Sequence, residues 1–265
     1  MTYSTEHNAY LRQIRHKKIL VVACQALILL AFFGLWEIAA HFGWIEAFIF
    51  SSPSRMWRML GIMLANGELF THIGATATQV VLGFVLGTIL GTLIAAMLWW
   101  SDFVRKVSAP YLVVFNALPK TALAPIIIVW MGNNPSAILV TALLISVVVT
   151  ILNMLTGFTQ VEQDKIKLTQ SFGASKLQTF TKVIFPASIG DLISALKINI
   201  GLSFVGVIVG EFLVAGSGLG FLIVYGSQIF RMDMVMLSIL ILCALAAVFY
   251  QIISVIEKRF ANWIQ

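Results

Sequence analysis

Long apolar runs separated by short polar connections dominate the sequence. A helix that crosses the hydrocarbon core of a bilayer needs roughly 20 mostly apolar residues. Six runs reach this length, and we predict a membrane-spanning helix in each: Ile19–Phe42, Gln79–Trp99, Ala109–Met131, Ala137–Phe158, Leu192–Val214 and Met234–Ile256. The pattern predicts an all-α integral membrane protein with about six transmembrane helices.

The segment between the first two predicted spans has a different character. It reads SSPSRMWRMLGIMLANGELF, and it is too short and too charged to cross a bilayer. Its mixture of polar and apolar residues is typical of a short helix that lies at the membrane interface. Ser52 or Ser54 is expected near the start of this helix, where a serine side chain can cap the first free amides.

Composition supports the bilayer as the solvent. Of the residues, 60% are hydrophobic and 11% are charged, whereas a soluble domain carries about 25% charged residues. The net charge of +6 does not indicate nucleic acid, because the basic residues lie in short loops between apolar runs. The two cysteines, Cys24 and Cys243, fall inside apolar runs without metal-ligand spacing, so no metal site is predicted.

The basic residues are distributed unequally between the two sides that six spans would define. Twelve lie in the N-terminal tail, the second and fourth connections and the C-terminal tail: Arg12, Arg15, Lys17, Lys18, Arg105, Lys106, Lys165, Lys167, Lys176, Lys182, Lys258 and Arg259. Only Arg55, Arg58 and Arg231 lie on the opposite side. Positive charge favours the cytoplasmic side. We therefore expect cytoplasmic tails at 1–18 and 258–265 around one transmembrane domain at 19–257.

The longest cytoplasmic connection, at about 159–187, is predicted to form two short helices. Gly173 lies where a turn between helices needs positive φ. Ser175 is placed to cap the second helix, and Pro186 is expected to end it. The apolar residues of the loop are Ile166, Phe172, Leu177 and Phe180. They are candidates to enter a groove on another protein, although a generic amphipathic loop would have the same composition.

Several polar residues lie inside the predicted spans. Lys120 lies between Pro119 and Pro125 near mid-membrane, where a charge costs at least about 2.5 kcal/mol on insertion scales. It is either a pathway cation that favours anionic solutes or a structural partner of a carboxylate or a helix C-terminus. The other candidates for a translocation path are Asn116, Asn199, Ser203 and Glu211. Bonding across helices within the bundle is the alternative for them.

Glycines recur every four residues in the second span, at Gly83, Gly87 and Gly91. This spacing places them on one helix face, where the absence of side chains allows another helix to approach closely. The partner helix belongs either to the same chain or to a second copy.

Four segments resemble those of a known family. The segment QSFGASKLQTFTKVIFPAS resembles the EAA loop of ABC importer permeases, in which a proline follows the glycine by thirteen residues, as Pro186 follows Gly173. Where the family pattern reads Glu-Ala-Ala, this chain has Lys167, Leu168 and Thr169. The segments IFSSPSRMWRML, NALPKTALAPIIIVWMGNNPSAILV and VGEFLVAGSGLGFLI resemble nitrate, sulfonate and taurine permeases. The resemblance runs from about Phe50 to the C-terminus.

The resemblance implies a multi-pass subunit of an importer in a bacterial inner membrane. Two permeases, expected as a homodimer, would form the path for a small solute such as nitrate, a sulfonate or taurine, or a thiamine-precursor-like heterocycle. A pair of ABC ATPase subunits would bind the loop, and an extracytoplasmic binding protein would deliver the solute. The loop residues that the resemblance assigns to ATPase coupling are Ser171, Phe172, Gly173, Ala174, Ser175, Leu177, Phe180 and Pro186.

The chain has no G-x-x-x-x-G-K-[ST] phosphate loop. We therefore expect no cofactor on this chain, with ATP and Mg²⁺ on the partner ATPase. No Ser/His/Asp or HExxH set indicates a catalytic residue, which disfavours an intramembrane enzyme. The remaining alternative is a secondary transporter or channel without an ATPase, which the loop pattern and the lack of a visible repeat disfavour.

Overall fold

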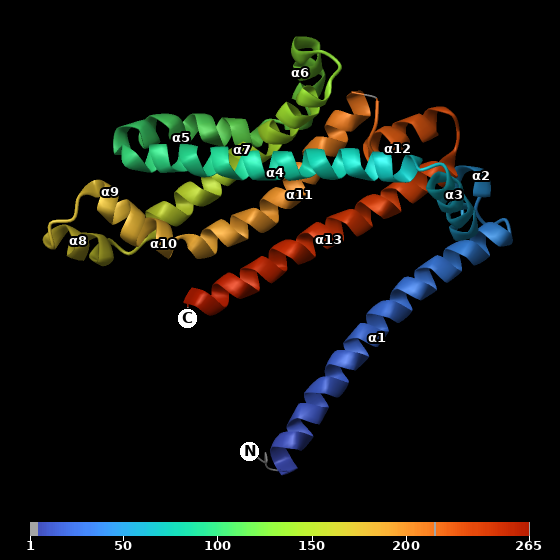
Figure 1. Ribbon diagram of the computed structural model, residues 1–265, viewed down its shortest axis with the longest axis horizontal. Helices are drawn as coiled ribbons and strands as arrows, with labels where there is room; N and C mark the ends of the chain where they lie inside the picture. Colours follow the sequence, from blue (N-terminus) through green and yellow to red (C-terminus); the bar gives the residue numbers. More distant parts are fainter. Residues whose placement is uncertain (1–4, 215, 265) are drawn as a thin grey trace.

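The computed structural model describes residues 5–214 and 216–264, and every regular element in these ranges is helical (Figure 1). The first half contains α1 (Thr5–His41), α2 (Ala47–Phe50), α3 (Pro53–Ala65), α4 (Glu68–Trp100), α5 (Asp102–Ala117), the 3₁₀ turn η1 (Lys120–Leu123), α6 (Ala124–Met131) and α7 (Pro135–Gln160). The second half contains α8 (Gln163–Ser171), α9 (Lys176–Thr179), the π-helical turn η2 (Phe180–Ile184), α10 (Phe185–Ala187), α11 (Ile189–Leu213), α12 (Leu219–Gln228) and α13 (Met232–Ile264).

Five of these helices, α1, α4, α7, α11 and α13, are long and apolar enough to cross a membrane. A sixth span is formed if α5 and the η1–α6 segment count as one, although the two are bent by 84°. The all-helical fold with about six spans is confirmed on this basis. The third span is broken rather than straight. Leu118 has extended backbone angles before Pro119, because the proline ring disfavours helical geometry in the residue that precedes it.

Helices also occupy most of the predicted tails. α1 begins at Thr5 and α13 continues to Ile264, so the ranges 1–18 and 258–265 mainly extend the first and last spans. Residues 1–4 and 265 of those tails lie outside the described residues.

The centre of the bundle is formed by α4, α7 and α11, and the glycines of α4 determine how closely the first two approach. A Cβ at Gly87 would lie 2.5 Å from Ser146 Oγ, and one at Gly91 would lie 2.6 Å from Thr150 Cβ. Gly83 similarly faces Ala142. The glycine face therefore packs within the chain, which decides between the two alternatives that the spacing left open.

The predicted interfacial helix is α3. The Ser52 side chain accepts the Arg55 backbone N–H and caps the helix, as expected. Met56, Met59 and Met63 lie buried on one face, against α12 and α13. α1 is connected to α3 by a hydrogen bond from Ser54 N–H to Glu37 Oε2, at 2.9 Å. Its most apolar stretch has no buried residue, and α1 stands apart from the bundle in Figure 1.

The two ends of the bundle differ in charge. Figure 1 shows the junction of α4 with α5, the α8–α10 loop and the C-terminus at one end, and α2, α3 and α12 at the other. We call the first the basic end. It carries Arg105, Lys106, Lys165, Lys167, Lys176, Lys182, Lys258 and Arg259.

Candidate functional site

The loop between α7 and α11 forms the helix–turn–helix that its sequence predicts. Gly173 has a φ of 77°, in the region that glycine adopts most readily. Its N–H donates to Gln170 O, and the next N–H, of Ala174, donates to Thr169 O, so the free carbonyls of α8 are satisfied. Ser175 caps α9 through a capping box with Gln178. The turn and the cap are both confirmed.

Three large apolar side chains of this loop point into solvent. Phe172 is 82% exposed, and Leu168 and Leu177 are each 58% exposed. We call these three residues the apolar knob. Ser171, Gly173 and Ser175 beside it are also exposed, and Ala174 is half-buried. The knob lies at the basic end of the bundle, beyond the last turns of α4 and α7.

Phe180 lies on the opposite side of the loop and faces the bundle. Its ring centroid is 5.0 Å from that of Trp99 on α4 and 5.3 Å from that of Phe158 on α7. Ile166 and Phe180 both pack against a core cluster that includes the fully buried Ile184. The apolar residues predicted to enter a partner groove thus divide into an exposed set and an anchoring set.

Pro186 does not end the second loop helix, contrary to expectation. It lies inside α10, and the π-helical turn η2 directly precedes it. The N–H of Phe185 bonds to Phe180 O, five residues earlier. Proline lacks an N–H and crowds the carbonyl four residues before it, so the wider turn accommodates it without a break. The helical path ends only at Ser188.

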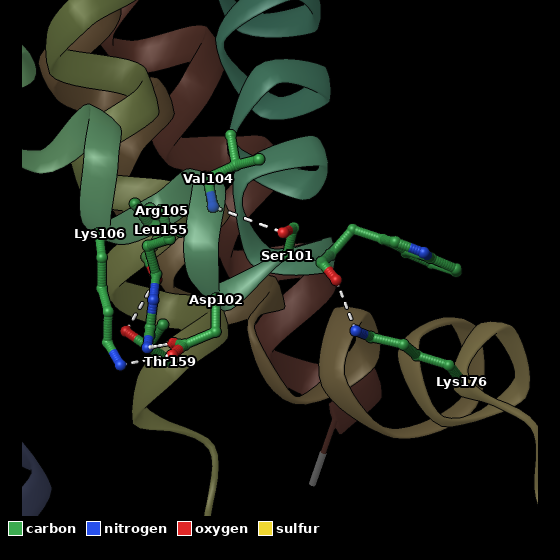
Figure 2. A network of polar contacts seen from close by, with 9 residues as sticks. Ser101, Asp102, Val104, Arg105, Lys106, Leu155, Thr159 and Lys176 are labelled. Carbon is green, nitrogen blue, oxygen red and sulfur yellow. Dashed lines mark hydrogen bonds and ion pairs between the residues drawn. The ribbon is translucent and has the colours of Figure 1, made fainter.

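A second contact joins the loop to the corner between α4 and α5, as Figure 2 shows. The Lys176 ammonium donates to Trp100 O and lies 5.6 Å from the ring centroids of both Trp99 and Trp100. At the same corner, Ser101 caps α5 by accepting the Val104 N–H. Sequence reasoning gave Lys176 no role beyond its charge, because its partners lie on a distant helix.

An ion-pair group completes this corner. Asp102, in the first turn of α5, pairs with Arg105 and Lys106 one turn further along the same helix (Figure 2). A carboxylate is favourable at a helix N-terminus. All three side chains are substantially exposed, so the pairs contribute little to overall stability.

Of the candidate path residues, Asn116 and Lys120 lie together at the break between α5 and η1. The Lys120 ammonium donates to Asn116 O at 3.2 Å, which is a contact with a helix C-terminus. Among the described residues, no carboxylate lies within ion-pair distance of Lys120. The other lysine inside a span, Lys197, pairs with Glu257 of α13 at 2.5 Å.

Asn199, Ser203 and Glu211 lie elsewhere, on the buried side of α11, each no more than 1% exposed. Asn199 Nδ2 donates to the Thr88 hydroxyl of α4 at 2.7 Å. The Ser203 hydroxyl has no hydrogen-bond partner in the described part of the chain. Each of the three residues therefore lies where α11 packs against α4, at a different point along the two helices, and no hydrogen bond joins any of them to Lys120 among the residues that the structure describes.

Glu211 is the centre of a polar cluster that sequence reasoning recognised only in part. Its carboxylate accepts the Thr76 hydroxyl at 2.8 Å and the Gly220 N–H at 2.7 Å. The neighbouring N–H groups of Gly218 and Leu219 donate to His72 Nδ1 and Thr76 Oγ1. The first amides of α12 are thus satisfied by side chains of α4 and α11. His72 and Thr76 were missed because nothing local in the sequence links them to residues far along the chain.

Comparison with known proteins places this geometry in a family. Residues 83–262 match the model of the family described as binding-protein-dependent transport system inner membrane component. The putative aliphatic sulfonates transport permease protein SsuC of Escherichia coli (strain K12) is 24% identical over 230 residues, covering 87% of this chain and 88% of SsuC. The formylaminopyrimidine transport permease protein ThiX of Halalkalibacterium halodurans is 29% identical over 196 residues, covering 74% of this chain and 77% of ThiX.

Solved structures agree at the level of the fold. A chain of the MetNI methionine ABC transporter in an inward-facing conformation superposes with a TM-score of 0.63 at 15% identity, covering 76% of this chain and 98% of that chain. The family match spans more than half of the sequence and includes α7 to α12. The chain therefore belongs to the family of binding-protein-dependent transport system inner membrane components, as a multi-pass permease subunit of an ABC importer.

Proposed function

We propose that two copies of this permease form the translocation path for a small anionic solute, and that the apolar knob connects each copy to one of a pair of separate ATPase subunits. The observation that carries the proposal is the exposure of Phe172, at 82%, on a loop whose other side is anchored in the bundle. A large, exposed apolar side chain on a loop that is anchored to the rest of the fold is typical of a surface that binds another protein.

The orientation follows from charge. Positive residues favour the cytoplasmic side of a membrane, and the α8–α10 loop and the C-terminal end of α13 share the basic end. We place this end, and both termini, in the cytoplasm, where ATP is available to a partner subunit. An extracytoplasmic binding protein would then deliver the solute at the end that carries α2, α3 and α12.

The position of Lys120 supports a second copy. Asn116 is exposed and Lys120 is only partly covered, so both lie on the surface of the single chain, at the break part-way along the third span. A charge at that depth costs at least about 2.5 kcal/mol against lipid on insertion scales. A second copy facing the first at the α5–η1 break would enclose the two residues in a polar path.

The same lysine supports an anionic solute, such as nitrate, a sulfonate or taurine. Lys197 is neutralised by Glu257, whereas Lys120 contacts only a backbone carbonyl among the described residues. An ammonium has three donor hydrogens, so Lys120 retains donors for a passing anion.

The mechanism that fits this arrangement is alternating access. ATP binding would close the ATPase pair and displace both loops, and the bundle would change which side it opens to; hydrolysis would reset it. The permease performs no covalent chemistry. It supplies two packing arrangements whose populations are shifted by ATP on one side and by the loaded binding protein on the other.

Co-purification of the ATPase with detergent-solubilised permease tests the proposal. Phe172→Ala removes a contact worth about 1.5–3 kcal/mol at full burial, which is on the order of a 10- to 100-fold loss of affinity. Phe103→Ala on α5 is the matched control, because Phe103 is also highly exposed, at 76%, but lies outside the loop. Equal recovery of ATPase with both variants would contradict the proposal.

A second variant addresses the turn. Nothing lies within 4 Å of a Cβ at Gly173, so only the positive φ is at issue. Aspartate and asparagine tolerate this conformation better than other residues. Gly173→Asp therefore acts mainly by placing a charge beside the knob, and Gly173→Asn is its neutral control. If Gly173→Asp keeps normal ATPase association and normal transport, the loop is not the coupling element.

A further inference from the structure

We propose that Lys176 is a positioning residue that transmits movement of the loop to the corner between α4 and α5, and through α5 to the break that carries Lys120. The inference rests on the proposed coupling function of the loop. It adds a specific connection between the apolar knob and the broken third span.

The first support is the choice of residue at this position. Lys176 is the first residue of α9, directly after the Ser175 cap. A cation at a helix N-terminus is unfavourable, because the free N–H groups there carry partial positive charge. The sequence is therefore locally inconsistent at Lys176, and such conflicts point to a role outside the helix itself.

The second support is what the ammonium contacts. Trp100 is the last residue of α4, and the final carbonyls of a helix lack partners within the helix. Lys176 donates to the Trp100 carbonyl and lies over the rings of Trp99 and Trp100. A cation is favourable at a helix C-terminus and over an indole ring. The unfavourable interaction of the Lys176 charge with the N-terminus of α9 is thus offset by its favourable contacts with the C-terminus of α4.

The third support is where this contact lies along the loop. Leu177 of the knob follows Lys176 directly, whereas Phe180, the apolar anchor, lies one helical turn further on. A cavity of about 250 Å³, lined by residues that include Lys176, Arg105 and Gln163, lies between α8 and the corner. At Leu177 the loop therefore meets the corner through the Lys176 contact beside this cavity, and the Phe180 ring adds packing against Trp99 and Trp100 one helical turn further on.

The corner can pass this movement on. Trp100 is followed by Ser101, which caps α5, so α4 and α5 are joined without a flexible linker. α5 has 16 residues, or a length of about 24 Å at 1.5 Å per residue. It ends at the 84° break before Lys120. A displacement of the knob would thus shift α5 and change the exposure of Asn116 and Lys120.

The experiment measures that change directly. A single cysteine replaces Asn116 in a Cys24→Ser, Cys243→Ser permease, assembled with its ATPase and reconstituted in lipid nanodiscs. The rate of modification by a charged methanethiosulfonate reagent is measured with and without ATP and vanadate. With Lys176 present, we expect the nucleotide to change this rate several-fold. With Lys176→Met, we expect no nucleotide effect, although the ATPase still co-purifies because the knob is intact.

The controls separate positioning from folding. Lys176→Arg keeps the charge and should retain the nucleotide effect. Lys165→Met removes an exposed lysine of the same loop that pairs only with Glu162, and should also retain it. A nucleotide effect that persists in Lys176→Met, or that Lys176→Arg also loses, overturns the inference. If Lys176→Met does not assemble, Lys176→Gln takes its place under the same criteria.

This outcome is distinguishable from failure of the coupling proposal. If the knob does not bind the ATPase, Phe172→Ala will leave co-purification unchanged. If the knob binds but Lys176 transmits nothing, Phe172→Ala will reduce co-purification while Lys176→Met leaves the nucleotide effect at position 116 unaltered.

Discussion

Thr76 and Glu211 are 135 residues apart in the sequence, yet the Thr76 hydroxyl donates to the Glu211 carboxylate at 2.8 Å inside the bundle. The same hydroxyl oxygen accepts the N–H of Leu219. One threonine on α4 thus bridges the carboxylate of α11 and the first turn of α12. The absence of a side chain at Gly218 makes room for this carboxylate, because a Cβ at that position would lie 2.3 Å from the Glu211 carboxyl carbon.

This cluster predicts a strong dependence of stability on Glu211. Glu211→Ala leaves the Gly220 N–H and the Thr76 hydroxyl without their acceptor, at a cost of about 1–3 kcal/mol for each buried group left unpaired. We expect the unfolding temperature of the detergent-solubilised permease to fall by several degrees. Tryptophan fluorescence during heating measures this temperature. Glu37→Ala is the control, because Glu37 also accepts a helix amide but is only partly covered. An equal change in both variants would argue against this role of Glu211.

The glycine face of α4 predicts position-specific tolerance. At Gly91 a Cβ meets Thr150 side-chain atoms at 2.6 Å and the Val147 carbonyl oxygen at 3.2 Å. Gly91→Ala should therefore cost about 1–3 kcal/mol through overpacking. Gly74→Ala on the same helix meets nothing within 4 Å, and should be neutral or stabilising by up to about 1 kcal/mol from helix propensity. The stability of both variants is measured by thermal unfolding and by the yield of monodisperse protein. If Gly74→Ala were the more destabilising of the two, α4 and α7 would pack differently from the contact described here.

Lys120 is predicted to act on transport rather than on assembly. Lys120→Met removes a charge-assisted hydrogen bond to an anion, worth about 1.5–3 kcal/mol, or roughly a tenfold loss of uptake or more. Co-purification of the ATPase should be unchanged. The uptake assay uses an anion identified by a ligand screen of the partner binding protein, and Lys120→Arg should retain most of the activity. Normal uptake by Lys120→Met would remove this residue from the path, and loss of assembly would assign it a structural role.

The orientation of the chain predicts opposite labelling at its two ends. In a Cys24→Ser, Cys243→Ser background, a cysteine at Arg58 on α3 should react with a membrane-impermeant maleimide in intact spheroplasts. A cysteine at Lys167 on α8 should react only after the membrane is opened. Both side chains are exposed in the single chain, so accessibility to the reagent depends on the side of the membrane. Labelling of position 167 alone in intact spheroplasts would reverse the proposed topology.

Local signals in the sequence predicted local structure well. The cap at Ser175 and the turn at Gly173 depend on residues within one helical turn, and both are confirmed. Ser52 caps α3 for the same reason. The importer family was identified from the resemblance of four segments to known permeases, and the family match over residues 83–262 decides against a secondary transporter or channel.

Predictions that depend on distant partners were weaker. Four-residue glycine spacing indicated a close helix contact, but the partner residues on α7 follow only from the packing of the whole bundle. Phe180 has the same apolar character as Phe172, yet it faces Trp99 because it lies on the side of the loop that packs against the bundle. The cluster at Glu211 needed Thr76, which no periodicity distinguishes from other small polar residues in spans. The path and coupling roles themselves remain predictions from the sequence, and the experiments above test them.

The Thr76–Glu211 contact also sets an order of events during biosynthesis. α4 and α7 can dock through their glycine face once the chain is synthesised and inserted as far as Gln160. The Glu211 carboxylate, which joins α4 to α12, follows only with α11, and the Gly220 N–H then completes its contacts. Independent insertion of spans before their association is the usual course for helical membrane proteins. Until α11 inserts, the Thr76 hydroxyl lacks its native partner, so a chain truncated before Glu211 would present an incomplete interface to the quality-control proteases of the membrane.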